Sequence, residues 1–203
     1  KVAKVSQVFD SVAGNYDLMN DLMSLGIHRL WKQFAIRRLR IKPGQMILDV
    51  AGGTGDLARL MHERLEGRGL ITIYDINANM LERGRQRLVD EGRIQGLYWA
   101  QGNAEELPFP DNTFHAVTIG FGIRNVTQID AAFREMVRVL RPGGQLLCLE
   151  FSHVDVEMLQ KAYDAFSFAV IPAVGKVVTG DGQPYRYLVE SIRTFPKQEE
   201  FKT

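Results

Sequence analysis

The sequence has little cysteine, no excess of either charge and no long apolar stretch. Cys148 is the single cysteine among 203 residues, so no disulfide can form within the chain and a reducing compartment is expected. It lies in the apolar run 146–149, which favours a small core residue over a nucleophile. The formal net charge of +1 gives no reason to expect nucleic acid as a partner. Arg37, Arg38 and Arg40 form a local basic cluster, for which a solvated helix face is the expected explanation.

Other absences narrow the class of protein. No apolar run is long enough to span a bilayer, and no signal-peptide pattern is visible, so we expect a cytoplasmic protein. Internal repeats, low-complexity blocks and Ser/Pro-rich linkers are lacking, which predicts a single domain over residues 1–203. The segment 62–66 lacks the second histidine of a zinc-protease motif, and we expect no metal site.

The chain is expected to begin with helices and to continue as alternating strands and helices. Apolar residues at helical spacing mark the first part of the chain, which ends at Pro43-Gly44. Short apolar runs then predict five strands, at 46–51, 70–74, 97–101, 116–121 and 145–151. Helices are expected at 57–65, 78–91 and 129–140, the last ended by the turn at 141–144. This alternation predicts an α/β fold with a mainly parallel sheet flanked by helices.

A glycine-rich turn follows the first predicted strand. Gly52, Gly53 and Gly55 stand between a strand and a helix, where backbone N–H groups can approach a ligand closely. Asp75 ends the next strand, where a carboxylate can accept both hydroxyls of a ribose. Residues 102–105 offer an amide and backbone groups that can read an adenine edge. The G-x-G-x-x-G spacing of dinucleotide-binding folds does not occur, so the pattern favours S-adenosylmethionine over NAD. A tight turn without a ligand is the alternative.

Longer motifs are similar to known families. The segments 48–56, 102–112 and 138–144 resemble class I methyltransferases in general. A more specific set resembles the ubiquinone/menaquinone biosynthesis C-methyltransferase family: YDLMND at 16–21, GIHRLW at 26–31, FGIRNVT at 121–127, LEFS at 149–152 and YLVESI at 187–192. The resemblance runs nearly from end to end of the chain.

The resemblance implies a Rossmann-like class I methyltransferase domain in three parts. These are an N-terminal helical cap (1–42), a Rossmann-like core (43–152) and a substrate-side helical region (153–203). The family's sheet normally finishes with an antiparallel hairpin. No such strands can be found before Thr203, so we expect the C-terminal strands to be missing from this chain.

The resemblance also implies the cofactor and the substrate. Family members transfer a methyl group from S-adenosylmethionine to a ring carbon of a polyprenylated benzoquinol, and in many bacteria of demethylmenaquinol as well. Thr54, Asp75, Asn103 and Ala104 match positions that hold the cofactor. Gly120 occupies a further cofactor position where members often carry Ser, so a hydroxyl contact would be missing there. Tyr16 is expected to close over the cofactor from the N-terminal helices.

Three residues are candidates for catalysis. Arg124 follows the fourth strand at the carboxyl edge of the sheet, where its permanent charge can stabilise a phenolate or hold a water that acts as base. A structural ion pair with a nearby acid is the alternative for Arg124. Asn125 can orient the same substrate hydroxyl. His28 has the intrinsic pKa of a general base, and a packed or capping residue is the alternative.

Expectations about partners follow from the polyprenyl tail. The apolar segments 159–170 and 171–178 can line a groove for it, and core packing or a homodimer interface is the alternative. A long tail stays in the membrane, so peripheral contact with the inner membrane is expected, from the mitochondrial matrix in a eukaryote. A quinone-biosynthesis complex is a further expected partner. Two other functions stay open: methylation of another small acceptor, or a non-catalytic S-adenosylmethionine-binding scaffold of such a complex.

Overall fold

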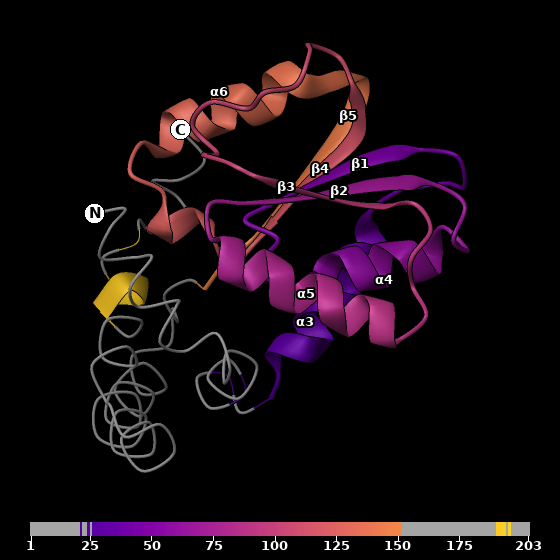
Figure 1. Ribbon diagram of the computed structural model, residues 1–203. Helices are drawn as coiled ribbons and strands as arrows, with labels where there is room; N and C mark the ends of the chain where they lie inside the picture. Colours follow the sequence, from indigo (N-terminus) through magenta and orange to yellow (C-terminus); the bar gives the residue numbers. More distant parts are fainter. Residues whose placement is uncertain (1–20, 22–23, 25, 152–189, 194, 196–203) are drawn as a thin grey trace. The chain divides into compact units, whose positions relative to one another are not determined.

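The computed structural model describes residues 21, 24, 26–151, 190–193 and 195 (Figure 1). The chain forms two compact units, one of Lys1–Ser6 with Arg29–Glu150 and one of Gln7–His28 with Phe151–Thr203. Nearly all described residues belong to the first unit. Most of the predicted N-terminal helices, the apolar helix at 159–170 and the segment 171–178 lie outside the described residues, and the division into cap, core and substrate-side region stays a prediction.

The first unit is built on a five-stranded parallel sheet. Its strand order is β3-β2-β1-β4-β5, and every neighbouring pair is parallel. The strands are β1 (Met46–Val50), β2 (Leu70–Asp75), β3 (Leu97–Gln101), β4 (Phe114–Gly120) and β5 (Leu140–Leu149). From β1 the chain first adds β2 and β3 on one side of the sheet and then β4 and β5 on the other. The switch point therefore lies between β1 and β4, and ligands of such sheets bind at the carboxyl ends of these two strands. The predicted Rossmann-like α/β fold is confirmed.

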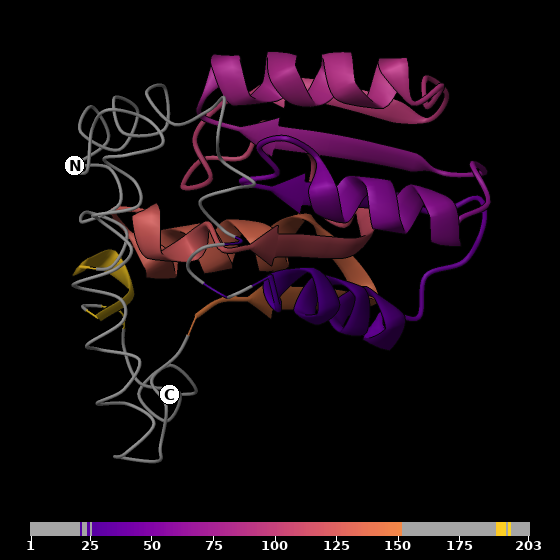
Figure 2. The ribbon, with the colours of Figure 1, turned by 90° about the horizontal axis from the view of Figure 1, so that it is seen from below.

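Helices cover both faces of this sheet. They are α3 (His28–Arg38), α4 (Asp56–Arg64), α5 (Ala78–Asp90) and α6 (Ile129–Val139), with a short 3₁₀ helix η1 at Ile123–Asn125. Figures 1 and 2 show α3, α4 and α5 on one face and α6 on the other, as right-handed crossovers from a central strand require. In the part of the chain that the structure describes, no helix is long and apolar enough to cross a membrane.

The sequence of β1 is almost entirely apolar because both faces of this strand are buried. Ile47, Leu48 and Val50 have no exposed surface, because helices pack on each side of the central strand. On α6, by contrast, only the stripe of Ala132, Met136 and Val139 is fully buried. This one-sided pattern is typical of a helix that lies on the surface of a sheet.

The start of β5 differs from the prediction. The turn at 141–144 was expected to separate α6 from a strand beginning at Gln145, but the strand begins at Leu140. Leu140 pairs with Phe114, and the next pair joins Gln145 to Ala116. The four residues between them form a bulge, with Gly143 in the left-handed region at φ 77°. Pro and Gly therefore interrupt the ladder here without ending the strand.

One helix packs directly against the glycine-rich turn. A Cβ atom added to Gly84 of α5 would lie 2.7 Å from the carbonyl carbon and 2.8 Å from the Cα of Thr54. These are backbone atoms, which cannot move aside as a flexible side chain can. Gly84 therefore sets how closely α5 approaches the turn that follows β1.

We predict that Gly84→Ala destabilises the fold by about 1–3 kcal/mol, because the added methyl group overpacks this contact. Urea unfolding of the variant beside the parent protein measures the difference in the free energy of unfolding. Arg83→Ala, one residue earlier on the exposed side of the same helix, is the control and should change it by less than about 0.5 kcal/mol. An equal loss of stability in both variants would show that the contact between Gly84 and Thr54 does not limit the stability of the fold.

Candidate active site

The turn between β1 and α4 can be built only with glycine at its centre. A Cβ atom on Gly52 would lie 2.7 Å from the Ile73 side chain and 3.0 Å from the Asp49 carbonyl oxygen. Gly53 and Gly55 have φ values of 50° and 77°, in the left-handed region. The N–H groups of Gly52, Gly53 and Gly55 donate to the Tyr74 carbonyl oxygen, the Asp75 carboxylate and the Gly52 carbonyl oxygen, so the fold itself fixes the backbone of this turn.

Asp75 holds this turn from the end of β2. Its Oδ2 accepts a hydrogen bond from Gly53 N at 2.9 Å, and its Oδ1 accepts one from Asn77 N at 2.8 Å. Burial raises the pKa of the Asp75 carboxyl, and hydrogen bonds from the backbone N–H groups of Asn77, Gly53 and Ile76 partly offset that effect. A carboxylate offers about four acceptor positions, so these bonds leave room for a hydrogen bond from a ribose hydroxyl. The structure therefore brings Asp75 and the predicted glycine turn together.

A charged network that was not anticipated from the sequence anchors the same turn. Asp56, the first residue of α4, accepts a hydrogen bond from Lys32 Nζ and another from Arg87 Nη2, each at 2.6 Å. Arg87 also donates to the Thr54 carbonyl oxygen at 2.8 Å. Burial alone would raise the pKa of Asp56, but the charges of Lys32 and Arg87 hold it well below its usual range. Helices α3 and α5 are thereby joined to the turn that begins α4.

The loop after β3 carries the predicted adenine-side residues, Asn103 and Ala104. A Cβ atom on Gly102 would lie 1.9 Å from the Tyr74 hydroxyl oxygen, so only glycine fits at the start of this loop. Asn103 accepts three hydrogen bonds: its carbonyl oxygen accepts from the Tyr74 hydroxyl at 3.3 Å and from Glu106 N at 3.1 Å, and its Oδ1 accepts from Glu105 N at 3.1 Å. The amide NH₂ of Asn103 thus remains a donor for a ligand.

Helix α6 clamps this loop at both ends. Glu105 Oε1 accepts hydrogen bonds from Thr127 N and Gln128 N, both at 3.0 Å, at the N-terminus of α6. Near the C-terminus of α6, Arg138 donates to the carbonyl oxygens of Leu107 at 2.9 Å and Phe109 at 2.8 Å. The sequence motif RVLRPGG pointed to a methyltransferase, but this role of its first arginine was not anticipated.

Arg124 is buried in an ion pair at the end of β4. Its Nη1 donates to Glu150 Oε1 at 2.6 Å and to the Phe121 carbonyl oxygen at 2.5 Å, and the residue is 4% exposed. The alternative expected for Arg124, a structural ion pair with a nearby acid, is therefore present. A catalytic role for Arg124 stays a prediction, as does that of Asn125 in η1, whose N–H donates to the Gly122 carbonyl oxygen at 3.0 Å.

Two of the four non-glycine residues with positive φ in the described part of the chain lie where β1 and β4 end. Ala51 and Phe121 both have positive φ values, 50° and 57°, which non-glycine residues rarely adopt. A Cβ atom on Gly122 would lie 2.5 Å from the Cβ of Ala51, so the two turns are in close contact. Such strain is concentrated at functional sites. The contact places the glycine turn beside the segment that holds Arg124.

The remaining predicted site residues have different surroundings. His28 is 2% exposed, with its Nδ1 2.9 Å from Ser24 Oγ and 3.6 Å from Asp21 Oδ1. His28 is thus a packed residue, which was the alternative to catalysis. Its role as general base stays a prediction. Tyr16 lies outside the described residues. At Gly120 a Cβ atom would lie 2.7 Å from the Leu57 side chain.

The buried acid Asp49 lies beneath the glycine turn. Its Oδ1 accepts a hydrogen bond from the Thr118 hydroxyl of β4 at 2.6 Å. Burial raises the pKa of Asp49 to about 7, with the Thr118 hydrogen bond and Lys32 opposing the rise and Asp75 adding to it. Burial and Glu150 raise the pKa of the Cys148 thiol to about 12, which fits a non-nucleophilic cysteine. The described residues include no His/Cys/Asp/Glu cluster suited to a metal ion.

A glycine turn held by the Asp75 carboxylate, at the switch point of a 3-2-1-4-5 parallel sheet, is typical of class I S-adenosylmethionine-dependent methyltransferases. The family model of the ubiE/COQ5 methyltransferase family matches residues 1–203. The chain belongs to this family.

Known proteins agree with that assignment. The chain is 54% identical over 202 residues to the ubiquinone/menaquinone biosynthesis C-methyltransferase UbiE of Methylococcus capsulatus, covering 100% of this chain and 82% of the relative. The UbiE protein of Pseudomonas aeruginosa is also 54% identical, covering 100% and 79%. Among solved structures, a SAM-dependent methyltransferase from Aquifex aeolicus aligns with a TM-score of 0.58 at 17% identity, over 68% of this chain and 76% of that chain. The last comparison shows the fold.

We predict that the cofactor-free protein loses stability as the pH rises from about 5 to about 8. A carboxyl whose pKa is raised on folding binds a proton in the folded state that the unfolded state has already released, so the folded state is favoured at low pH and loses this advantage as Asp49 ionises near pH 7. Asp75 contributes with the same sign. Thermal unfolding across this pH range should show a shallower slope for Asp49→Asn than for the parent. An unchanged slope would mean that Asp49 is ionised throughout.

Proposed function

We propose that this chain transfers the methyl group of S-adenosylmethionine to a ring carbon of a polyprenylated quinol, a benzoquinol or demethylmenaquinol. The observation that carries the proposal is the family match along the whole chain, which includes the segments outside the nucleotide-binding core. Two of these segments, FGIRNVT and LEFS, supply the buried pair of Arg124 and Glu150 beside the glycine turn. Both motifs follow strands at the carboxyl edge of the sheet, where a ring hydroxyl of the acceptor would bind.

The residues of the chain that fit the cofactor are those around the glycine turn. Gly52, Gly53 and Gly55 form the turn that begins α4, the Asp75 carboxylate suits the ribose, and the Asn103 amide suits the adenine. When bound, S-adenosylmethionine supplies an electrophilic methyl group on a sulfonium. Such a displacement needs the acceptor carbon in line with the breaking bond, so the main task of the site is to position the two.

Arg124 and Glu150 would act as a unit on the acceptor. A quinol attacks through its ring carbon more readily when a ring hydroxyl loses its proton, and a guanidinium beside that oxygen stabilises the resulting charge. Arg124 cannot itself accept a proton at physiological pH, since its charge is permanent. Glu150, 2.6 Å from Arg124 Nη1, is the nearby carboxylate that can take the proton through a water molecule. Asn125 would orient the same hydroxyl.

The expected partners are part of this proposal. The polyprenyl tail keeps the acceptor in the lipid phase, so the enzyme has to meet it at a membrane surface, from the cytoplasm or from the mitochondrial matrix. A homodimer or a quinone-biosynthesis complex would be compatible with the same chemistry. Methylation of another small acceptor and a non-catalytic scaffold are the alternatives that an activity measurement separates.

We predict transfer of radiolabelled methyl from S-adenosylmethionine to chemically reduced demethylmenaquinol, to methoxy-benzoquinol, or to both. The label should be found on ring carbon, and the ratio of the two products gives the preferred acceptor. The oxidised quinones should not be labelled, because an oxidised ring is a poor nucleophile. Cofactor binding in a calorimeter without any labelled quinol would favour the scaffold or another acceptor.

Arg124→Ala tests the residue assignment within the same assay. We expect turnover to fall by about a hundredfold or more while the affinity for S-adenosylmethionine stays near that of the parent. Removing one partner of a buried ion pair also destabilises the protein, because Glu150 is left unpaired. The double variant Arg124→Met/Glu150→Gln removes both charges and is the control for folding. If cofactor affinity is lost in the double variant as well, Arg124 belongs to the cofactor site or the scaffold.

A further inference from the structure

Helix α3 presents an apolar and basic face to solvent. Its buried side carries Ala35, Ile36 and Leu39, which pack on the core of the first unit. On the opposite side Leu30 is 64% exposed and Phe34 is 59% exposed. Large apolar side chains at this exposure, one turn apart, are not explained by packing within the described part of the chain.

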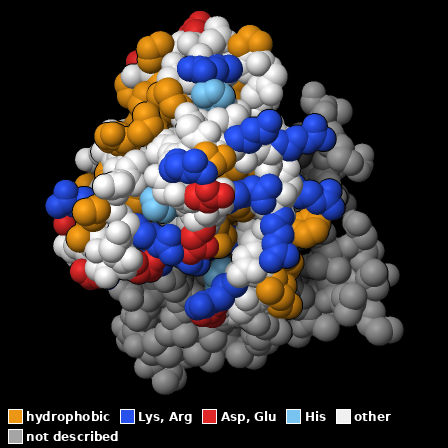
Figure 3. Space-filling view, turned by 90° about the vertical axis from the view of Figure 1, so that its right-hand side faces the viewer, with side chains coloured by type: hydrophobic (Ala, Val, Ile, Leu, Met, Phe, Trp, Pro, Cys, Tyr) orange, Lys and Arg blue, Asp and Glu red, His pale blue; other side chains and the backbone are white. Residues whose placement is uncertain are grey.

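Basic side chains continue this face beyond the apolar pair. Arg37 and Arg38 form the last turn of α3, Arg40 follows it, and all three are exposed. The Arg38 guanidinium lies 4.6 Å from the centre of the Phe34 ring, so charge and apolar surface adjoin. Figure 3 shows Lys and Arg side chains gathered beside hydrophobic ones on the face where α3 ends.

Acidic residues are absent from this part of the sequence. Between Asp21 and Asp49 there are six Lys or Arg residues and no Asp or Glu. Among the described residues, none of the exposed arginines 37, 38 and 40 forms an ion pair. The whole chain carries a net charge of only +1, so this surface concentrates positive charge that is balanced elsewhere.

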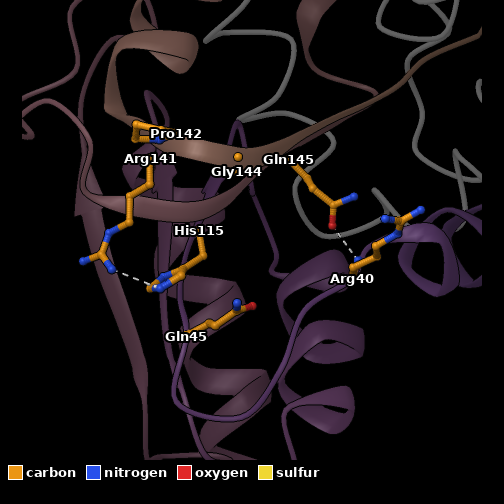
Figure 4. A pocket seen from close by; sticks show the side chains of 8 residues that line it. Arg40, Gln45, His115, Arg141, Pro142, Gly144 and Gln145 are labelled. Carbon is orange, nitrogen blue, oxygen red and sulfur yellow. Dashed lines mark hydrogen bonds between the residues drawn. The ribbon is translucent and has the colours of Figure 1, made fainter.

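A hollow next to Arg40 extends the basic surface. It has a volume of about 250 Å³ and lies between the end of α3 and the bulge at the start of β5. Arg40 and Arg141 stand on opposite sides of it (Figure 4). The floor is polar: Gln145 Oε1 accepts a hydrogen bond from Arg40 N at 2.6 Å, and His115 Nδ1 accepts one from Met46 N at 3.1 Å.

The contact between His115 and Arg141 indicates what this hollow can accept. Nη1 of Arg141 lies 3.0 Å from His115 Nε2, so the guanidinium is held at the hollow. A guanidinium in this position can bind an oxyanion, such as the phosphate of a lipid headgroup.

We propose that the outward face of α3 and the adjoining hollow form a docking surface for a membrane that contains anionic phospholipids. Leu30 and Phe34 enter the interface between headgroups and acyl chains, and Arg37, Arg38, Arg40 and Arg141 contact the phosphates. A short helix with one apolar side and a basic border is the form expected of a surface-bound membrane helix. The inference rests on the proposed function for its purpose, which is to bring the protein to a membrane that holds the lipid acceptor, but not for its physical basis.

Cosedimentation of the full chain with lipid vesicles tests the proposal. The parent should bind vesicles of phosphatidylcholine with added phosphatidylglycerol, and bind vesicles of phosphatidylcholine alone far more weakly. Arg37→Gln/Arg38→Gln/Arg40→Gln should weaken binding on the order of a hundredfold, since each basic residue at an anionic surface contributes about tenfold or less. Leu30→Ser/Phe34→Ser should weaken binding as well, and its effect should remain at high salt.

A matched triple variant on other helices is the control. Arg83→Gln/Arg85→Gln/Arg134→Gln removes the same charge from exposed positions on α5 and α6 and should bind vesicles as the parent does. Equal loss in both triple variants, binding that does not depend on phosphatidylglycerol, or no binding by the parent would overturn the proposal. So would a parent dimer that Leu30→Ser/Phe34→Ser converts to monomers without any vesicle binding, because the face would then be a contact between two copies.

Failure of the proposed function can be distinguished from failure of the docking surface. Methyl transfer to a short-chain, water-soluble quinol without vesicles should be the same in the parent and in the Arg37/Arg38/Arg40 variant. Vesicle binding by a parent that methylates no quinol would contradict the proposed function and leave the docking surface intact. Quinol methylation without vesicle binding would contradict the docking surface alone.

Discussion

The position of the glycine turn depends on Asp56. It begins α4 directly after the glycine turn, and two cations from other helices converge on its carboxylate. Lys32 is only 8% exposed at its side chain, and it lies 5.7 Å from the centre of the Phe121 ring as well as in contact with Asp56. A buried cation of this kind is tolerated only with a partner, so Lys32 and Asp56 require each other.

Close packing around the turn depends on this arrangement. Gly84 brings α5 to the backbone of Thr54, and from the same helix Arg87 reaches both Thr54 and Asp56. On the other side Asp75 holds Gly53. The backbone of the turn is thus fixed both from α5 and from β2. A turn fixed in advance costs less conformational entropy when a ligand binds.

Local patterns in the sequence were enough to predict much of this. The strand–glycine–helix arrangement located Gly52 to Gly55, and strand length placed Asp75 at the same edge of the sheet. The alternation of strands and helices predicted the parallel sheet, and four of the five strands were located to within a few residues. These features are local, or follow from the handedness of crossovers, so a single sequence contains the information.

What the sequence did not reveal depends on contacts between distant residues. Lys32 and Arg87 lie in ordinary amphipathic helices, and no spacing rule identifies the acid that each one meets. The same holds for Arg138, which clamps a loop roughly thirty residues earlier in the chain. The start of β5 was misplaced because Pro142 and Gly143 usually end an element, whereas here they form a bulge inside a strand. The roles of Arg124, Asn125 and His28 stay predictions.

Calorimetric titration of S-adenosylmethionine into Asp56→Asn tests the central claim most directly, namely that the charged network holds the turn in the form that binds the cofactor. Glu63→Gln, which breaks ion pairs with Arg59 and Arg93 away from the turn, is the matched control. The account predicts at least a tenfold weaker affinity for Asp56→Asn, on the order of 1.4 kcal/mol, with the control unchanged. Parent-like affinity in a folded Asp56→Asn protein would contradict it.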